Sequence, residues 1–146
     1  MLYKGGNDER SLIIKLKLNM NTMTTQEIAN RLVEICRTGD YGKAIQELYS
    51  PSIVSVEPEG IPNRIVSGFD ALEEKSKNFN AKIESINSSE ISDPLVADNI
   101  FSVAMLMNVN MKGVPVPVDM NEICVYTVAE GKIVKEEFFF TPQPQG

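Results

Sequence analysis

Two hydrophobic periods divide this chain into a helical part and a strand-rich part. Ile28, Leu32 and Ile35 recur at helical spacing behind the sequence TTQE at 24–27, which is a capping box. Gly39 then ends the predicted helix. From residue 82 onward the period is two, which is typical of half-buried strands.

Two more helices and one strand are expected before that change. Asp40 can cap a second helix, and residues 53–57 read as a first strand. Gly68 precedes a third helix, in which Asp70 and Glu73 are expected to form another cap of the box type.

The remaining chain predicts strands joined by short turns. Residues 82–93 form an irregular strand with a bulge at Ser88-Ser89, and Glu130-Gly131 is a tight hairpin turn. The strands between them alternate clearly. One is expected to place Phe101, Val103, Met105, Met107, Val109 and Met111 on one face, and the next Val116, Val118, Met120, Glu122, Cys124, Tyr126 and Val128. The last strand places Val134, Glu136, Phe138 and Phe140 on one face.

Helices followed by a run of strands predict an α+β fold, with helices packed on one face of an antiparallel sheet. The length of 146 residues indicates one domain. We place that domain at 23–141, after an N-terminal extension (1–22) and before a polar tail (142–146).

The composition of the chain limits the partners and the kinds of active site that we expect. The net charge of −6 argues against a nucleic-acid partner. The chain has no histidine and two cysteines, so we expect no metal, no cofactor and no histidine base, and we assign acid–base chemistry to carboxylates. No apolar run of about 20 residues and no secretory signal is visible, so we expect no membrane contact and a cytoplasmic location.

Two glutamates stand on faces that are otherwise apolar. Glu122 lies between Met120 and Cys124, and a carboxylate in such surroundings should be desolvated, with a raised pKa. It could then donate a hydrogen bond to a substrate oxygen; alternatively it pairs with a lysine or arginine, or lies at a wet rim. Glu136 likewise lies between apolar residues, Val134 and Phe138, on one face of the last strand. The alternative for Glu136 is that this face of the strand is exposed to solvent. The predicted ligand-binding residues around them are Tyr49, Val103, Met105, Met107, Met120, Cys124, Tyr126, Phe138 and Phe140.

Three short motifs resemble the SnoaL-like branch of the nuclear-transport-factor-2-like superfamily, which includes ketosteroid isomerase and polyketide cyclases. They are RLV at 31–33 leading to TGD at 38–40, VEP at 56–58 followed by Gly68, and VAEGKIV at 128–134. The resemblance implies a cone-shaped, strongly curved sheet with three helices, as in cystatin-like folds. It also implies a pocket at the open end of the cone, and a homodimer.

The resemblance also suggests roles for particular residues. Glu57 matches the proton-shuttling aspartate of ketosteroid isomerase, and Glu122 lies near its protonated aspartate. The catalytic tyrosine of that enzyme falls on Leu32, which cannot donate a hydrogen bond. The principal acid–base aspartate of SnoaL-type cyclases falls near Asp119 or Glu122. By residue pattern alone, Val54 and Val56 look more core-like than Glu57.

Two functions follow as hypotheses. The first is a cofactor-independent isomerase, cyclase or hydratase that acts on a hydrophobic carbonyl compound, with Glu57, Glu122 and Glu136 as catalytic carboxyl groups. The second is a non-catalytic ligand-binding module or a dimeric interaction module with the same pocket.

Overall fold

The computed structural model describes residues 22–142. The predicted extension therefore lies outside the described residues except for Thr22, and so does the predicted tail except for Pro142. Three helices and seven strands make up the described chain. They are α2 (Thr25–Arg37), α3 (Tyr41–Leu48), β1 (Tyr49–Val56), β2 (Ile65–Ser67), α4 (Phe69–Lys82), β3 (Ile83–Ile91), β4 (Leu95–Ala97), β5 (Ile100–Met111), β6 (Val118–Ala129) and β7 (Lys132–Phe139).

Local sequence explains where two of the helices begin. At α2 the Thr24 hydroxyl accepts from the Glu27 amide at 3.2 Å, and the Thr24 amide donates to the Glu27 carboxylate at 3.0 Å. This is the predicted capping box. At α3 the Asp40 carboxylate accepts from the Lys43 amide at 3.1 Å, as expected.

The cap predicted for the third helix is wrong. Gly68 is the N-cap of α4, with φ +85°, and no side chain makes a capping hydrogen bond there. A cap must stand before the first helical residue, whereas Asp70 already lies in the first turn. At that position its carboxylate can only interact favourably with the positive end of the helix dipole.

The sheet is mixed rather than wholly antiparallel. Its strand order is β2-β1-β7-β6-β5-β3, and β4 pairs with β5 beside β3. All pairs are antiparallel except β1 with β7, which are parallel. The last strand returns next to the first one, and this brings residues 49–56 beside residues 133–137.

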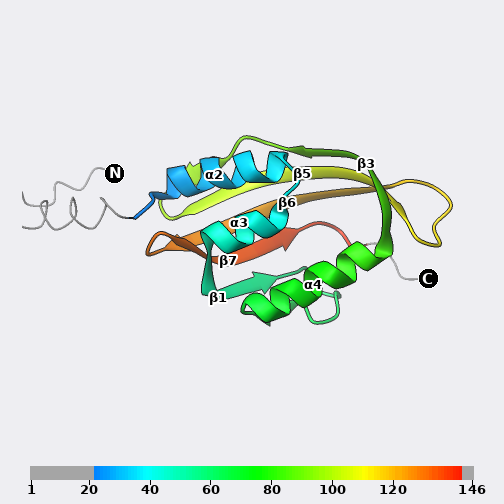
Figure 1. The fold of residues 1–146 in the computed structure, drawn as a ribbon, viewed down its shortest axis with the longest axis horizontal. Coiled ribbons are helices and arrows are strands. Elements are labelled where there is room, and N and C mark those ends of the chain that lie inside the picture. Colours follow the sequence, from blue (N-terminus) through cyan, green and yellow to red (C-terminus); the bar gives the residue numbers. More distant parts are fainter. Residues whose placement is uncertain (1–21, 143–146) are drawn as a thin grey trace, which may run out of the picture.

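The helices lie along one face of this sheet (Figure 1). Helix α2 packs against β3, β4 and β5, while α3 packs against β1 and α4 against β1 and β2. β3 curves away from the end of α4 toward the opposite side of the sheet (Figure 1). The inner, helix-covered face therefore carries the core, where Phe101 and Tyr126 stack with ring centroids 4.8 Å apart.

Register shifts decide which side chains face inward. In β3 the extra residues are Glu84 and Asn87, and Asn87 lies one position before the predicted bulge. In β7 the extra residue is Val134, because Thr127 pairs with Lys135 while Val128 pairs with Ile133. Ile133 and Glu136 are both buried as a result, although they are three residues apart. Ile133 therefore takes the buried position before Glu136 that the sequence pattern assigned to Val134.

Candidate functional site

The inner face of β1, β6 and β7 carries a cluster of acidic and hydroxyl side chains. Glu57 directly follows β1 and shares the parity of Ile53 and Ser55, which are both fully buried. Val54 and Val56 are only half-buried, so the pattern-based view that they are the core positions is wrong. β1 therefore directs Ser55 and Glu57 toward the helices.

Glu136 lies at the centre of this cluster and is 5% exposed. The Tyr49 hydroxyl donates a short hydrogen bond to its Oε2, and the Ser55 hydroxyl donates to its Oε1 at 2.8 Å. The parallel pairing of β1 with β7 sets Ser55 directly opposite Glu136. Burial raises the pKa of Glu136, and this effect exceeds the opposite effect of the two hydroxyl donors.

Lys75 on α4 supplies the positive charge of the cluster. Its Nζ lies 2.5 Å from Glu57 Oε1 and donates to Ser55 Oγ at 2.8 Å. It also lies 4.7 Å from the centroid of the Phe138 ring, within cation–π range. A continuous polar chain thus runs from Tyr49 through Glu136, Ser55 and Lys75 to Glu57.

Glu122 on β6 is the third carboxyl group. Burial, and to a smaller extent the negative charge of Glu57, raise its pKa to about 7, although the Cys124 thiol and Lys75 act in the opposite direction. Within the described part of the chain, its polar contact is with the Cys124 thiol, which donates to Oε1 at 3.6 Å. The shifted pKa means that Glu122 changes charge near neutral pH, which is the property expected of a general acid or hydrogen-bond donor.

Asp119, the other candidate for an acid–base aspartate, does not join the cluster. It is exposed and accepts a hydrogen bond from the Asn108 amide at 2.8 Å. Its position is three residues from Glu122, so the alternation of β6 turns it to the outer face.

The predicted ligand-binding residues fall into two groups. Tyr49, Val103, Cys124 and Tyr126 are buried within the hydrophobic core. Met105, Met107, Met120, Phe138 and Phe140 are half-buried along β5, β6 and β7 and the residue after it. Burial raises the pKa of both tyrosines and both cysteines, so all four groups are neutral at physiological pH.

Lys75 and Ser55 are absent from the sequence-based predictions. Lys75 lies three residues after the buried Leu72, hence on the inner side of α4, and this spacing is the signal that could have identified it. Ser55 alternates with Ile53 and Glu57, but a serine in a strand gives no cue to burial on its own.

Two hollows on the surface lie away from the carboxyl cluster. One, of about 520 Å³, lies between α3 and α4 and is lined by Gly42, Ile45, Gln46, Phe69, Glu73 and Ser76. The other, of about 490 Å³, lies between the end of α2 and β3, and its lining includes Cys36, Arg37, Tyr41 and Ile91. Neither is lined by the predicted site residues, so the predicted apolar pocket stays a prediction.

Within residues 22–142, no three His, Cys, Asp or Glu side chains are arranged to hold a metal ion. In the same part of the chain, no helix is long and apolar enough to cross a membrane.

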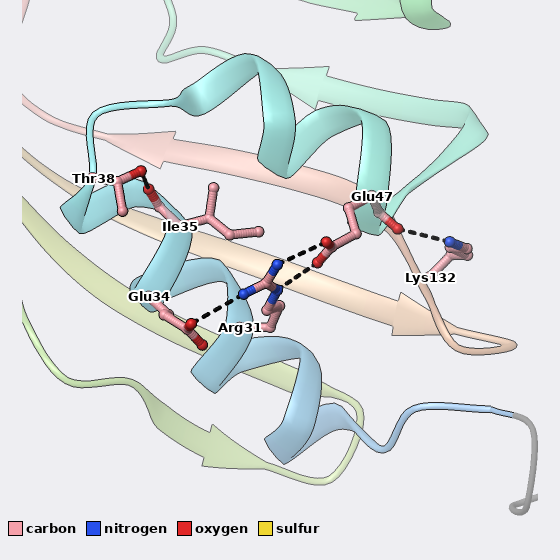
Figure 2. Close-up of polar contacts among 6 residues, drawn as sticks. All are labelled: Arg31, Glu34, Ile35, Thr38, Glu47 and Lys132. Carbon is pink, nitrogen blue, oxygen red and sulfur yellow. Dashed lines mark hydrogen bonds and ion pairs between the residues drawn. The ribbon is translucent and has the colours of Figure 1, made fainter.

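A second polar cluster lies at an outer corner of the molecule, where α2, α3 and the β6–β7 hairpin meet (Figure 2). Arg31 binds the Glu47 carboxylate through Nε at 2.6 Å and through a terminal nitrogen at 2.9 Å, and it pairs with Glu34 at 3.0 Å. Lys132 donates to the backbone carbonyl of Glu47 at 2.8 Å. Because Glu47 lies in the last turn of α3, this contact satisfies a carbonyl at the end of the helix.

The sequence matches the model of the SnoaL-like domain over residues 23–140. The chain belongs to the SnoaL-like domain family. Among proteins of curated function, no significant match to this SnoaL-like protein was found.

Solved structures agree with this family. A protein from Mesorhizobium loti, proposed to be a SnoaL-like polyketide cyclase, is 29% identical, with 81% of this chain and 100% of that chain covered and a TM-score of 0.76. A nuclear-transport-factor-2-like protein of unknown function from Burkholderia pseudomallei is 12% identical, with 82% and 92% covered and a TM-score of 0.67. A protein from Catenulispora acidiphila with a ketosteroid isomerase-like fold, solved with trimethylamine, is 18% identical, with 81% and 88% covered and a TM-score of 0.62. The α+β fold and the family inferred from the sequence are thus confirmed.

Proposed function

We propose that this SnoaL-like protein catalyses proton transfer on an apolar carbonyl compound, without a cofactor, at the cluster of Glu57, Glu122 and Glu136. One observation carries the proposal. Three carboxyl groups from three neighbouring strands gather around a single ammonium group on the covered face of the sheet, and the pKa of Glu122 is about 7.

The roles follow from the charges. Glu57 lies beside Lys75 at the end of the polar chain, and we assign it the role of the base that removes a proton from carbon. Glu122 is protonated below about pH 7 and donates to the carbonyl oxygen, where negative charge develops. Glu136 is held by Tyr49 and Ser55 and keeps the arrangement in place. The half-buried Met105, Met120 and Phe138 supply apolar contact for the ligand.

The direct test is hydrogen–deuterium exchange. The protein is incubated in D₂O with a panel of apolar ketones, and loss of the α-proton signal is followed by NMR. Glu57→Gln should abolish exchange, and Glu122→Gln should reduce it roughly 100-fold. Glu34→Gln, at the outer corner, is the control and should leave the rate unchanged. Exchange by the wild-type protein should also fall as the pH rises through about 7, because Glu122 loses its proton. Equal exchange rates in the wild-type protein and Glu57→Gln would refute the proposal.

The non-catalytic alternative is favoured by a different surface. Leu106, Ile123 and Phe139 are 43%, 46% and 54% exposed on three adjacent strands, although all three are large and apolar. We propose that this row on the outer face of the sheet is the contact surface of a homodimer. Sedimentation velocity should give a dimer that Ile123→Lys dissociates, and a wild-type monomer at micromolar concentration would refute the dimer.

A small molecule retained through purification and seen by native mass spectrometry would support binding, and the exchange assay then decides between binding and catalysis. A cytoplasmic location is part of the proposal, and it is supported by Cys36 and Cys124, which are both buried as free thiols. Recovery of the protein with the membrane or secreted fraction would contradict that location.

A further inference from the structure

The Lys75 ammonium group has more hydrogen-bond donors than its contacts with the carboxyl cluster use. Its ammonium group has three N–H donors, of which Glu57 Oε1 and Ser55 Oγ take two. Among residues 22–142 no other acceptor binds Lys75, so one donor is left for a ligand. The Lys75 side chain is 30% exposed, whereas the side chain of its partner Glu57 is 15% exposed, so Lys75 has the more accessible side chain of the pair.

The same ammonium group acts on every carboxyl group of the cluster. It pairs with Glu57 directly, and its field lowers the pKa of both Glu122 and Glu136. Ser55 fixes its position, because the Ser55 hydroxyl accepts from Lys75 and donates to Glu136. The ring of Phe138 also contacts the ammonium group, with its centroid 4.7 Å from Lys75 Nζ. Lys75 is therefore positioned by contacts with two strands and does not depend on its own flexible side chain.

We infer that Lys75 is an oxyanion-binding residue, and that the ligand is an enolisable ketone whose oxygen takes the third Lys75 donor. This rests on the proposed function above.

The charge balance of the step supports this role. Glu57 removes the proton from the α-carbon, the C–H electron pair becomes the C=C bond, and the carbonyl π pair moves to oxygen as an enolate. Glu57 becomes neutral in the same step, so its attraction for the Lys75 ammonium group weakens as the enolate charge appears. Lys75 exchanges one anionic partner for another, so it stabilises the enolate more strongly than the neutral ketone.

A phenol that changes colour on ionisation tests this inference without turnover. We would titrate 4-nitrophenol into the wild-type protein and follow the absorption of phenol and phenolate as a function of pH. The bound probe should ionise at a lower pH than the free probe. Lys75→Met should lose phenolate affinity by roughly 10- to 100-fold, whereas Lys75→Arg should retain the preference for phenolate.

Two further variants separate oxyanion binding from a structural role. Glu57→Gln removes the anion that competes for Lys75, so it should bind phenolate several-fold more tightly than the wild-type protein. Lys77→Met, on the exposed side of the same helix and paired only with Glu73, should not change binding. Near-ultraviolet circular dichroism would verify that Lys75→Met is folded.

The inference is overturned if Lys75→Met binds phenolate as well as the wild-type protein, if Glu57→Gln binds it more weakly, or if the wild-type protein binds no phenolate. These outcomes are independent of the exchange assay. Exchange that persists in Lys75→Met would leave the proposed function standing without Lys75. Phenolate binding that depends on Lys75, with no exchange of any ketone, would refute the proposed reaction instead.

Discussion

Two polar clusters of this protein use the same residue types for different purposes. At the outer corner Arg31 faces the carboxylates of Glu34 and Glu47, and Lys132 binds a backbone carbonyl (Figure 2). In the inner cluster three carboxyl groups share the single ammonium group of Lys75. Opposite charges are matched in the first cluster, and acidic groups are in excess in the second.

The pKa values of the carboxyl groups differ between the two clusters in the same way. The hydrogen bond from Arg31 lowers the pKa of Glu47, which is exposed, whereas burial raises the pKa of Glu122 to about 7. The family motifs contribute to both clusters. Arg31 and Lys132 belong to the outer corner, whereas Glu57 of the motif at 56–58 belongs to the inner cluster. Thr38, from the motif at 38–40, donates to the Ile35 carbonyl at 2.6 Å as α2 ends (Figure 2). The motif residues of the outer corner and of the end of α2 therefore report the fold, while the acidic groups of the inner face are the candidates for chemistry.

The largest expected effect comes from removing the positive charge of each cluster in turn. Lys75→Met should lower the free energy of unfolding by roughly 2–3 kcal/mol at pH 8, because Glu57 loses its ion pair and Glu136 loses a compensating charge. The loss should shrink at pH 5, where the buried carboxyl groups are more protonated. Urea unfolding measures both values.

Lys132→Met is the matched control for this comparison. Its ammonium group is exposed and binds one backbone carbonyl, so its loss should cost less and depend little on pH between 5 and 8. Equal costs for the two lysine variants would show that the two clusters do not differ as described.

The second effect is a change in the pH dependence of stability. Since the pKa of Glu122 is raised from 4.5 to about 7, the folded protein binds more protons than the unfolded chain between these values. The stability of the wild-type protein therefore falls as the pH rises through this window. Glu122→Gln should remove the contribution of Glu122 to that fall and stabilise the protein by about 2 kcal/mol at pH 8, with little change at pH 5, while the raised pKa of Glu136 leaves its own contribution in place.

Glu34→Gln provides the comparison, because Glu34 is an exposed member of the outer corner and should not alter the slope between pH 5 and 8. If Glu122→Gln unfolds with the same pH profile as the wild-type protein, Glu122 titrates as an ordinary surface carboxyl group.

The smallest expected effect concerns Glu47. Because its pKa is lowered, the stabilisation that it supplies is complete above its ordinary pKa of 4.5 and is lost as the pH falls through the lowered value. At pH 7, Glu47→Gln should be slightly less stable than the wild-type protein, and the difference should shrink in 1 M salt because exposed pairs are screened. Thermal melts in low and high salt measure it. A difference that resists salt would mean that the bidentate geometry, rather than charge, is responsible.

The secondary structure could be predicted well because its signals are local. The capping box at Thr24, the cap at Asp40 and the change of period at residue 82 each depend on a few neighbouring residues. The features that the sequence did not predict either join distant segments of the chain or depend on the exact residue at which an element begins. The parallel pairing of β1 with β7 joins segments about 80 residues apart, and the cap at Gly68 depends on where α4 begins.

The candidate site was predicted only in part for the same reason. Glu122 and Glu136 could be identified because a carboxylate on an apolar strand face is conspicuous, whereas Glu57 was suggested by the family resemblance and not by its pattern. Ser55 gave no local signal, and the spacing of Lys75 from Leu72 indicates which side of α4 it occupies but not its partners. Their importance follows from the contacts that α4 and β1 make with β7 and its side chains.

The sequence by itself determined the α+β class, the positions of most helices and strands, and the family, and its lack of histidine led to the expectation of carboxylate chemistry. It could do so because capping, periodicity and composition act over short distances along the chain. Only the tertiary structure decided that Lys75 stands among Glu57, Glu122 and Glu136. That arrangement depends on the parallel register of β1 with β7 and on the bulge at Val134, and both are fixed by how distant segments bury their apolar faces together.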